Sequence, residues 1–285
     1  MSQEAYAYIR SVCEQRSLPH ARNLLGKHDK GQDGDVLDVI APEYAKYLKT
    51  NLSISGFDQK SVEKRVAALN GYYDYLHVNG YDNAFKSQSK FRPTILEEFM
   101  SLLFGDVIAD YREKAGVEDD ALSFGSVKAH ANLYFYGSDF VRFVQQPTIG
   151  INQKDQDFAV YRKAALSIDS QRPIRVCLPV IAVENKTYID KTMFEGSVAT
   201  AEKIKAGNPY CLFYIVTEWY DVSFDVDPVY SRIDQIYVLR KSKRKGEWTP
   251  IDAGVVCRLV EDVIAHFGRP WSEIERKLSD TGVLI

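Results

Sequence analysis

The sequence predicts an α/β protein with a mixed central sheet flanked by helices, preceded by a helical N-terminal region. The apolar, β-branched run 176–183 is typical of a buried strand, and a second such run covers 211–216. A helix between them is indicated by the capping box Thr192–Glu195, and it ends before the breaker sequence 207–209. A strand, a helix and a strand at this spacing form a βαβ crossover, so part of the sheet is parallel.

An earlier strand is expected to pair with the first of these runs as a hairpin. Residues 154–161 have the pattern of a polar turn entering a strand, and Asp157 is the last acid before that strand begins. The segment 167–173 is rich in turn formers, which favours an antiparallel hairpin. This hairpin would bring Asp157 across from Glu184. Asp155 is the alternative acid, two positions earlier.

The buried strand 176–183 ends in Glu184-Asn185-Lys186. Side chains alternate along a strand, so Glu184 and Lys186 project from the same face. Such charges at the end of a buried strand are costly unless they are paired or used. Together with Asp157, they would form an oxygen-ligand site for Mg²⁺ beside a lysine able to orient water or neutralise phosphate charge. The alternatives are a surface ion pair for Glu184 and Lys186, and a turn or cap role for Asp157.

A helix is predicted over 95–104, with Pro93 in its first turn. On a helical wheel, Glu97 and Glu98 border the two edges of its apolar stripe. Periodicity alone does not choose between them as a functional acid beside the site. Both glutamates could instead be ordinary first-turn acids favoured by the helix dipole.

The order of acid, hairpin and Glu-x-Lys resembles the PD-(D/E)xK nuclease superfamily, with Gln156 where that pattern places proline. Over roughly its last two-thirds, the chain resembles the subunits of BbvCI-type heterodimeric restriction endonucleases. The segments that carry this resemblance are 95–99, 156–158, 184–187, 190–194, 199–201, 218–221 and 233–244. It implies a restriction-endonuclease-like core.

The resemblance also implies a Mg²⁺-dependent Type II endonuclease that cuts double-stranded DNA at an asymmetric site and leaves 5′-phosphate ends. Two homologous but non-identical subunits would each cut one strand; whether a chain without its sister forms a homodimer is left open by the sequence. By this analogy Asp157 and Glu184 are metal ligands, Lys186 is the catalytic lysine and Glu97 is a further acid near the metal. Two rival functions stay open: a non-catalytic DNA-binding subunit, and an Mrr-like or repair nuclease of low specificity.

The formal net charge of −3 argues against indiscriminate binding to nucleic acid. Contacts with phosphates need only local basic clusters, and the chain offers two of them. One is 241–245 and the other is 86–92. The residues that we expect to contact DNA phosphates are Lys90, Arg92, Lys241, Lys243 and Arg244. Either cluster could instead be a solvated polar loop.

Residues 1–88 are predicted to be mostly helical, with segments near 5–13, 35–48 and 61–77, and to serve dimerisation or DNA recognition. Residues 89–285 would form the catalytic core, closed by an apolar helix over 255–267 and a short helix from Trp271 to Leu278. No apolar run is long enough for a membrane span, and no signal peptide is evident. With four widely separated cysteines, these features favour a reducing cytoplasm, which the resemblance to restriction endonucleases implies is bacterial.

Overall fold

The computed structural model describes residues 2–85, 90–118, 121–167, 172–269 and 273–284. Its central sheet has the strand order β1-β2-β3-β4-β5. The strands are β1 (Ser123–Tyr136), β2 (Thr148–Leu166), β3 (Ile174–Ile189), β4 (Leu212–Tyr220) and β5 (Gln235–Val238). The pairings β1–β2 and β2–β3 are antiparallel, whereas β3–β4 and β4–β5 are parallel. The predicted mixed sheet is therefore confirmed.

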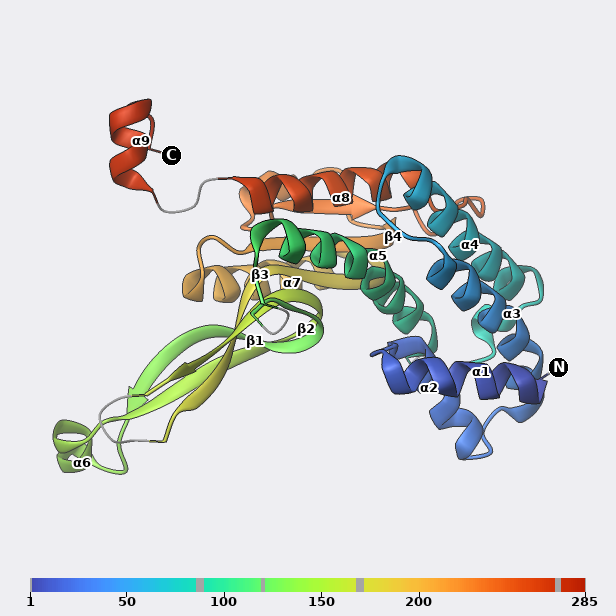
Figure 1. The fold of residues 1–285 in the computed structure, drawn as a ribbon, viewed down its shortest axis with the longest axis horizontal. Helices are drawn as coiled ribbons and strands as arrows, with labels where there is room; N and C mark the ends of the chain where they lie inside the picture. The colour runs from blue at the N-terminus through green and yellow to red at the C-terminus, as the bar shows by residue number, and fades with distance from the viewer. Residues whose placement is uncertain (1, 86–89, 119–120, 168–171, 270–272, 285) are drawn as a thin grey trace.

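Helices α5 (Phe91–Ala115) and α8 (Ala253–Gly268) cover one face of this sheet and α7 (Lys191–Gly207) covers the other (Figure 1). The remaining helices are α1 (Ser2–Gln15), α2 (Pro19–Asp29), α3 (Gly34–Ser53) and α4 (Gln59–Val78) in the N-terminal region, α6 (Phe140–Gln145) between β1 and β2, and α9 (Ile274–Asp280) near the C-terminus. Along β3, Ile181 and Val183 belong to the core shared with α5 and α8, while Ala182 belongs to a second core under α7. This alternation follows from the pleat of the strand.

The N-terminal helices α1–α4 confirm the predicted helical region, and α2 was not predicted. Their apolar residues continue the core that lies between α5 and the sheet, from Leu37 and Tyr44 to Phe99 and Phe158. The predicted boundary between residues 88 and 89 lies outside the described residues. The division into two domains therefore stays a prediction.

Three predicted element boundaries were wrong. Asp157 does not begin its strand, because β2 starts at Thr148 and pairs with β1 over its first half. The N-cap of α7 is Asp190 rather than Thr192, since the Asp190 carboxylate accepts a hydrogen bond from the Met193 amide at 2.8 Å. The last helix begins at Ile274, and residues 271–272 of the predicted segment lie outside the described range.

A fully buried histidine in α2 predicts a pH dependence of stability. The ring nitrogens of His20 lie 3.0 Å from Thr94 Oγ1 and 2.9 Å from Tyr72 Oη. Burial lowers the pKa of His20 to about 3 from its ordinary 6.5. Its contribution is therefore complete above pH 6.5 and is lost as the pH falls towards 3, at about 1.4 kcal/mol per pH unit. We expect His20→Gln to reduce this slope in urea unfolding between pH 7 and pH 5.

Glu98 should have the opposite effect on the pH dependence of stability, and it therefore provides a control. Burial raises its pKa to about 7 from 4.5, although Tyr44 Oη donates a hydrogen bond to its carboxylate at 2.6 Å. The contribution of Glu98 is complete below pH 4.5 and is lost as the pH rises through 7. Glu98→Gln should therefore steepen the loss of stability between pH 7 and pH 5. Equal slopes in the wild type and in the His20→Gln variant would contradict the assignment.

Candidate active site

The β2–β3 hairpin brings three of the predicted site residues together. The register that pairs Phe158 with Val183 places Asp157 level with Glu184. The backbone N–H of Asn185 donates a hydrogen bond to Asp157 Oδ2 at 2.9 Å, which holds that carboxylate against β3. Lys186 Nζ lies 3.3 Å from Glu184 Oε2 and 3.8 Å from Asp157 Oδ2. The lysine therefore bridges the two carboxylates.

Glu97 of α5 faces the same site. It lines a cavity of about 730 Å³ together with Lys90, Asp157, Lys186 and Tyr188, among others. Burial raises the pKa of Glu97 to about 7, and the negative charge of Asp157 contributes to the rise. The structure thus separates two glutamates that periodicity left equivalent. Glu98 points away, into the helical core.

The pKa of Asp157 is also raised, by burial first, against the opposing charge of Lys186. Its rival Asp155 is exposed, pairs in register with Lys128 of β1, and is not among the residues lining the cavity. Of the two acids that the sequence offered, Asp157 is therefore the one at the cavity.

The donors at the site fit a hard divalent cation. Among the described residues, no group of three or more His, Cys, Asp and Glu side chains lies close enough to hold a metal ion by itself. However, Asp157, Glu184 and Glu97 offer carboxylate oxygens, the ligand type that Mg²⁺ prefers. The raised pKa values of Glu97 and Asp157 show that Lys186 does not fully compensate for burying several acids together. A bound cation would supply the missing positive charge.

Ser197 of α7 is a site residue that sequence reasoning missed. Its Oγ lies 2.6 Å from Glu184 Oε2 and 3.0 Å from the Met193 carbonyl oxygen, and its side chain is buried. The hydroxyl can donate to Glu184 and so hold one carboxylate oxygen in place. The available signal was a serine on the same helical face as the apolar residues Phe194, Ala201 and Ile204.

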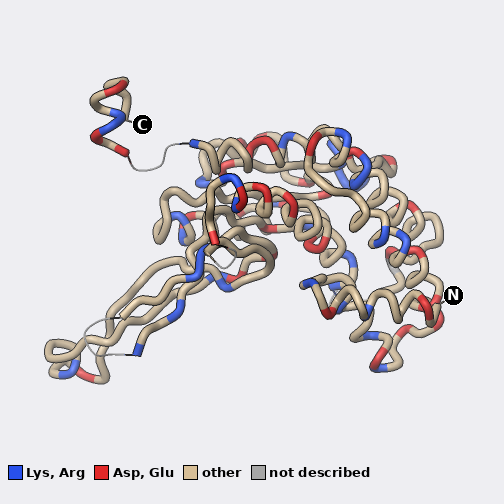
Figure 2. The backbone as a smooth tube through the Cα atoms, in the orientation of Figure 1, with Lys and Arg blue, Asp and Glu red and all other residues tan. Residues whose placement is uncertain are grey.

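The predicted phosphate-contact residues are in different surroundings. The Arg244 guanidinium lies 3.7 Å from the centre of the Tyr188 ring, at the cavity, and its Nε lies 3.3 Å from Asp221 Oδ2. Lys241 pairs with Asp252 at 2.6 Å, and Lys243 lies over an aromatic ring. Residues 86–89 lie outside the described residues. Basic and acidic positions are interspersed over the backbone (Figure 2), in keeping with the small net charge.

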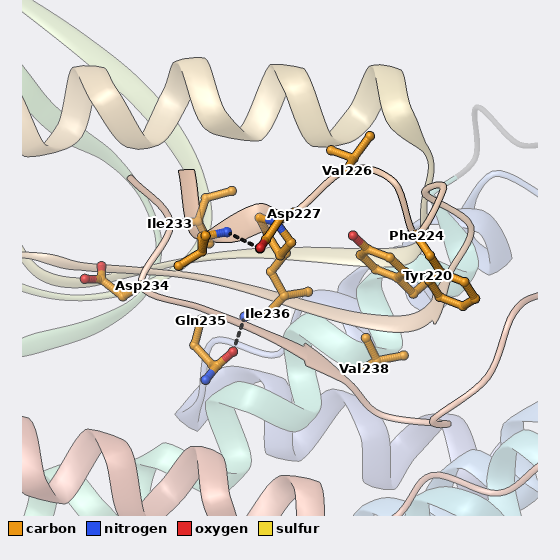
Figure 3. A pocket seen from close by; sticks show the side chains of 11 residues that line it. Tyr220, Phe224, Val226, Asp227, Ile233, Asp234, Gln235, Ile236 and Val238 are labelled. Carbon is orange, nitrogen blue, oxygen red and sulfur yellow. Dashed lines mark hydrogen bonds between the residues drawn. The ribbon is translucent and has the colours of Figure 1, made fainter. Parts of the chain in front are cut away.

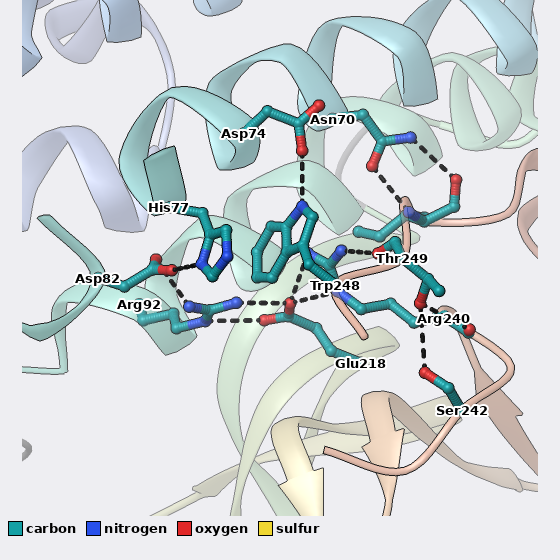
Figure 4. Close-up of polar contacts among 11 residues, drawn as sticks. Asn70, Asp74, His77, Asp82, Arg92, Glu218, Arg240, Ser242, Trp248 and Thr249 are labelled. Carbon is teal, nitrogen blue, oxygen red and sulfur yellow. Dashed lines mark hydrogen bonds and ion pairs between the residues drawn. The ribbon is translucent and has the colours of Figure 1, made fainter. Parts of the chain in front are cut away.

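Arg92 belongs to a largely buried ionic cluster rather than to a basic surface (Figure 4). Its guanidinium lies 2.7 Å from Asp82 Oδ1 and 2.9 Å from Glu218 Oε2. Arg240 reaches Glu218 Oε2 from the other side, also at 2.9 Å. The aromatic rings of Tyr73, Trp219 and Trp248 surround the two guanidinium groups. Because Arg92 already has two carboxylate partners, we do not assign it to phosphate binding.

A second cavity, of about 660 Å³, lies beside β5 under the loop that contains Phe224 and Val226 (Figure 3). The two acidic side chains that line it accept hydrogen bonds from backbone amides. Asp227 accepts a hydrogen bond from the Val229 amide at 2.9 Å, and Asp234 accepts one from the Phe213 amide at 2.7 Å. Both carboxylates therefore act as turn and strand anchors, and the cavity offers no comparable constellation for chemistry.

Within the described residues, no helix is both long enough and apolar enough to cross a membrane.

The family model of the Bpu10I restriction endonuclease matches residues 88–252, more than half of the chain. A solved structure described as "native BbvCI A2B2 tetramer at low resolution" shares the fold, with a TM-score of 0.61 and 23% sequence identity. That likeness covers 87% of this chain and 93% of the other. No curated protein matches the chain.

Proposed function

We propose that this chain, which belongs to the Bpu10I restriction endonuclease family, is a subunit of a Type II enzyme and hydrolyses one strand of double-stranded DNA. The observation that carries this proposal is the meeting of Asp157, Glu184 and Lys186 at one end of the hairpin. Glu97 of α5 supports it from across the cavity. We also propose that the protein acts in the bacterial cytoplasm.

Asp157 and Glu184 would hold Mg²⁺, with Glu97 close by. When bound, the ion would lower the pKa of a water ligand and stabilise negative charge on the scissile phosphate. Lys186 orients the attacking water or balances that charge from its place between the carboxylates. The Asn185 amide and the Ser197 hydroxyl keep the two acids in position. The products would be a 5′-phosphate and a 3′-hydroxyl.

The structural relative is described as an A2B2 tetramer, that is, as an assembly of two kinds of subunit. We extend this arrangement to the present chain and propose a second, homologous but non-identical subunit that cuts the other strand of an asymmetric site. Lys90 and Arg244 are the basic residues best placed to meet DNA phosphates, since Lys90 lines the cavity and Arg244 stacks on Tyr188. Lys241 and Lys243 would extend that contact.

The test is incubation of supercoiled plasmid with this chain and Mg²⁺, with and without a co-expressed sister subunit. Discrete linear fragments that form only with the sister are expected. Cutting at random positions would favour a nuclease of low specificity. DNA binding without cleavage in any pairing would favour a non-catalytic binding subunit.

Ser197→Ala is expected to raise the Mg²⁺ concentration that catalysis requires, without unfolding the protein. The change removes the hydrogen bond that holds Glu184, and loss of such a supporting contact lowers metal affinity or activity by about 10–100-fold. We expect the Mg²⁺ concentration for half-maximal nicking to rise by about tenfold. It is measured by titrating Mg²⁺ in the plasmid assay.

Thr200→Ala is the matched control, because Thr200 lies on the same helix and its hydroxyl donates only to the Gly196 carbonyl oxygen at 3.0 Å. Its Mg²⁺ titration should coincide with that of the wild type. An unchanged titration in the Ser197→Ala enzyme would remove Ser197 from the site.

A further inference from the structure

An asparagine at the candidate active site has a side chain without a hydrogen-bond partner. Asn185 is 4% exposed, and neither its Nδ2 nor its Oδ1 has a partner among the described residues. Buried polar groups in proteins are normally hydrogen-bonded, because an unpaired group loses its bonds to water on folding without replacement. An unpaired carboxamide at a functional cavity therefore indicates a ligand that supplies the missing bonds.

This side chain faces the cavity that holds the other site residues. Asn185 lines it together with Glu97, Asp157 and Lys186. Successive side chains of a strand point to opposite faces, so Asn185 projects from the face of β3 that carries Val183, which belongs to the core shared with α5. Lys186 projects from the other face. The two neighbours therefore address different parts of the cavity.

The N-terminus of α5 lies at the same cavity. Phe91, Arg92 and Pro93 of its first turn line the cavity, and no side chain caps this helix among the described residues. The first N–H groups of a helix lack partners within it and attract anions, phosphate groups above all. Lys90, which is exposed and also lines the cavity, adds a positive charge. The helix end and the unpaired Asn185 side chain are independent features, and both indicate a ligand with acceptor oxygens.

The acids at the cavity determine which phosphate can bind there. Glu97 and Asp157 would repel a free anion, and the guanidinium of Arg92 is already paired with Asp82 and Glu218. A phosphate within a DNA strand is instead held in place by contacts along the strand, and a neutral carboxamide can bind it without adding a buried charge. A base edge is a poorer candidate, because the charged groups of this cavity would act on the backbone.

We propose that Asn185 binds the DNA phosphate next to the scissile one. Its Nδ2 donates to an oxygen of that phosphate, the backbone N–H groups of Phe91 and Arg92 donate to the same phosphate, and Oδ1 accepts from a water molecule of its hydration shell. The inference rests on the proposed function, in which Lys186 acts at the scissile phosphate. The two neighbouring residues then differ in role, since Lys186 contributes to the chemical step and Asn185 to binding.

The experiment compares binding and cutting by Asn185→Leu, which has a similar size but no hydrogen-bonding group. The probe is a duplex oligonucleotide that contains the cut site mapped from the plasmid fragments. It is bound by the two-subunit complex with Ca²⁺, an ion that takes the same oxygen ligands as Mg²⁺, and a gel verifies that the DNA stays intact. We expect the dissociation constant to rise by about 10–100-fold, the usual effect of losing a hydrogen bond to a charged group.

The rate of cutting should respond differently. With Mg²⁺ and saturating DNA, the single-turnover rate of Asn185→Leu should differ from that of the wild type by less than about threefold, because the contact is made equally in the ground state and in the transition state. Lys186→Ala should show the reverse pattern, in which binding is kept and cutting is lost.

Asn51→Leu is the matched control. Asn51 is also a buried asparagine with an unpartnered Oδ1, but it lies on α3 and does not line this cavity. Its complex should bind the duplex as the wild type does. Salt dependence gives a second comparison. Asparagine is uncharged, so the slope of log affinity against log salt should be unchanged in Asn185→Leu, whereas Lys90→Ala should reduce its magnitude by about 0.9.

A chemical change in the DNA identifies the phosphate. Replacing the phosphate on either side of the scissile one with an uncharged methylphosphonate is tested at both positions. At one of them it should weaken binding by the wild type and have little further effect on Asn185→Leu, since the two changes remove the same contact. Additive losses at both positions would overturn the proposal, as would an unchanged affinity of Asn185→Leu for the unmodified duplex.

Urea unfolding distinguishes binding from a structural role and needs no DNA. Removing an unpaired buried carboxamide should leave the unfolding midpoint of Asn185→Leu at or above that of the wild type. Asn185→Ala is measured alongside, so that a poorly folded leucine variant does not decide the result. A lower midpoint in both variants would show that the asparagine is structural and would overturn the proposal.

Failure of the proposed function has a different signature. A wild-type complex that neither binds nor cuts DNA would overturn that function, and this inference with it. A wild-type complex that cuts, while Asn185→Leu binds the duplex equally well, would overturn the inference alone.

Discussion

Replacing Lys186 with alanine is expected to abolish cutting of one DNA strand by the two-subunit enzyme while DNA binding survives. The ammonium group lies between Glu184 and Asp157, and no other lysine or arginine is found that close to both carboxylates among the described residues. Removing a preorganised charge that acts on the transition state costs about 10²–10³-fold or more in rate. The supercoiled plasmid should accumulate as the nicked circle, because the sister subunit still cuts its own strand.

Glu184→Gln tests the same site with almost unchanged shape. The amide oxygen can still accept the hydrogen bond from Ser197, but the negative charge that would hold the metal is lost. We therefore expect the same nicked product. Lys191→Ala is the control, since Lys191 is exposed and pairs only weakly with Glu195, at 3.9 Å. Full double-strand cleavage by the Lys186→Ala or Glu184→Gln complex would exclude these residues from catalysis.

The parts of this fold that were predictable have strong local signals. β3 and β4 each contain a continuous apolar run, and α7 lies between a cap and a breaker sequence, so the crossover could be predicted from the sequence. β1 and the first half of β2 have no such pattern. They form an arm with polar and aromatic residues on both faces, and their regularity comes from pairing with each other. For this reason Asp157 was placed at the start of a strand that it in fact occupies near the middle.

The part of the candidate site that lies on strands could be predicted from the sequence. Asp157, Glu184 and Lys186 follow from one hairpin and the alternation of side chains. Glu97 could not be separated from Glu98 in this way, because α5 is buried by the sheet on one side and by the N-terminal helices on the other. Ser197 and Arg92 depend on contacts between distant elements, and periodicity within one segment carries no information about them.

Glu218→Ala is expected to cost about 3–5 kcal/mol of unfolding free energy, because it breaks a buried ionic cluster from its centre. Glu218 is 1% exposed and holds Arg92 and Arg240 at 2.9 Å each. Without it, two guanidinium groups remain near each other inside the protein, with Asp82 as the carboxylate left to Arg92. Urea unfolding of the purified chain measures the loss.

A surface pair provides the control. Glu261 and Arg258 lie 3.9 Å apart with both side chains mostly exposed, so Glu261→Ala should change the free energy by less than about 1 kcal/mol. A second variant separates the charge from the packing. Glu218→Leu combined with Arg240→Met replaces one buried ion pair with apolar groups, and it should recover part of the loss seen with Glu218→Ala. Equal stability of Glu218→Ala and the wild type would show that the cluster does not stabilise the fold.

The ionic cluster also lies beside the candidate active site, so its loss should affect catalysis as well as stability. Arg92 lies in the first turn of α5, which also carries Glu97, and Glu218 lies near the end of β4, next to the strand that carries Lys186. The ion pair therefore ties the helix to the sheet beside the cavity, which Arg92 lines. We expect folded Glu218→Gln, which keeps the shape but loses the charge, to need more Mg²⁺ for half-maximal nicking than the wild type. A titration identical to that of the wild type would show that Glu97 is positioned by packing alone.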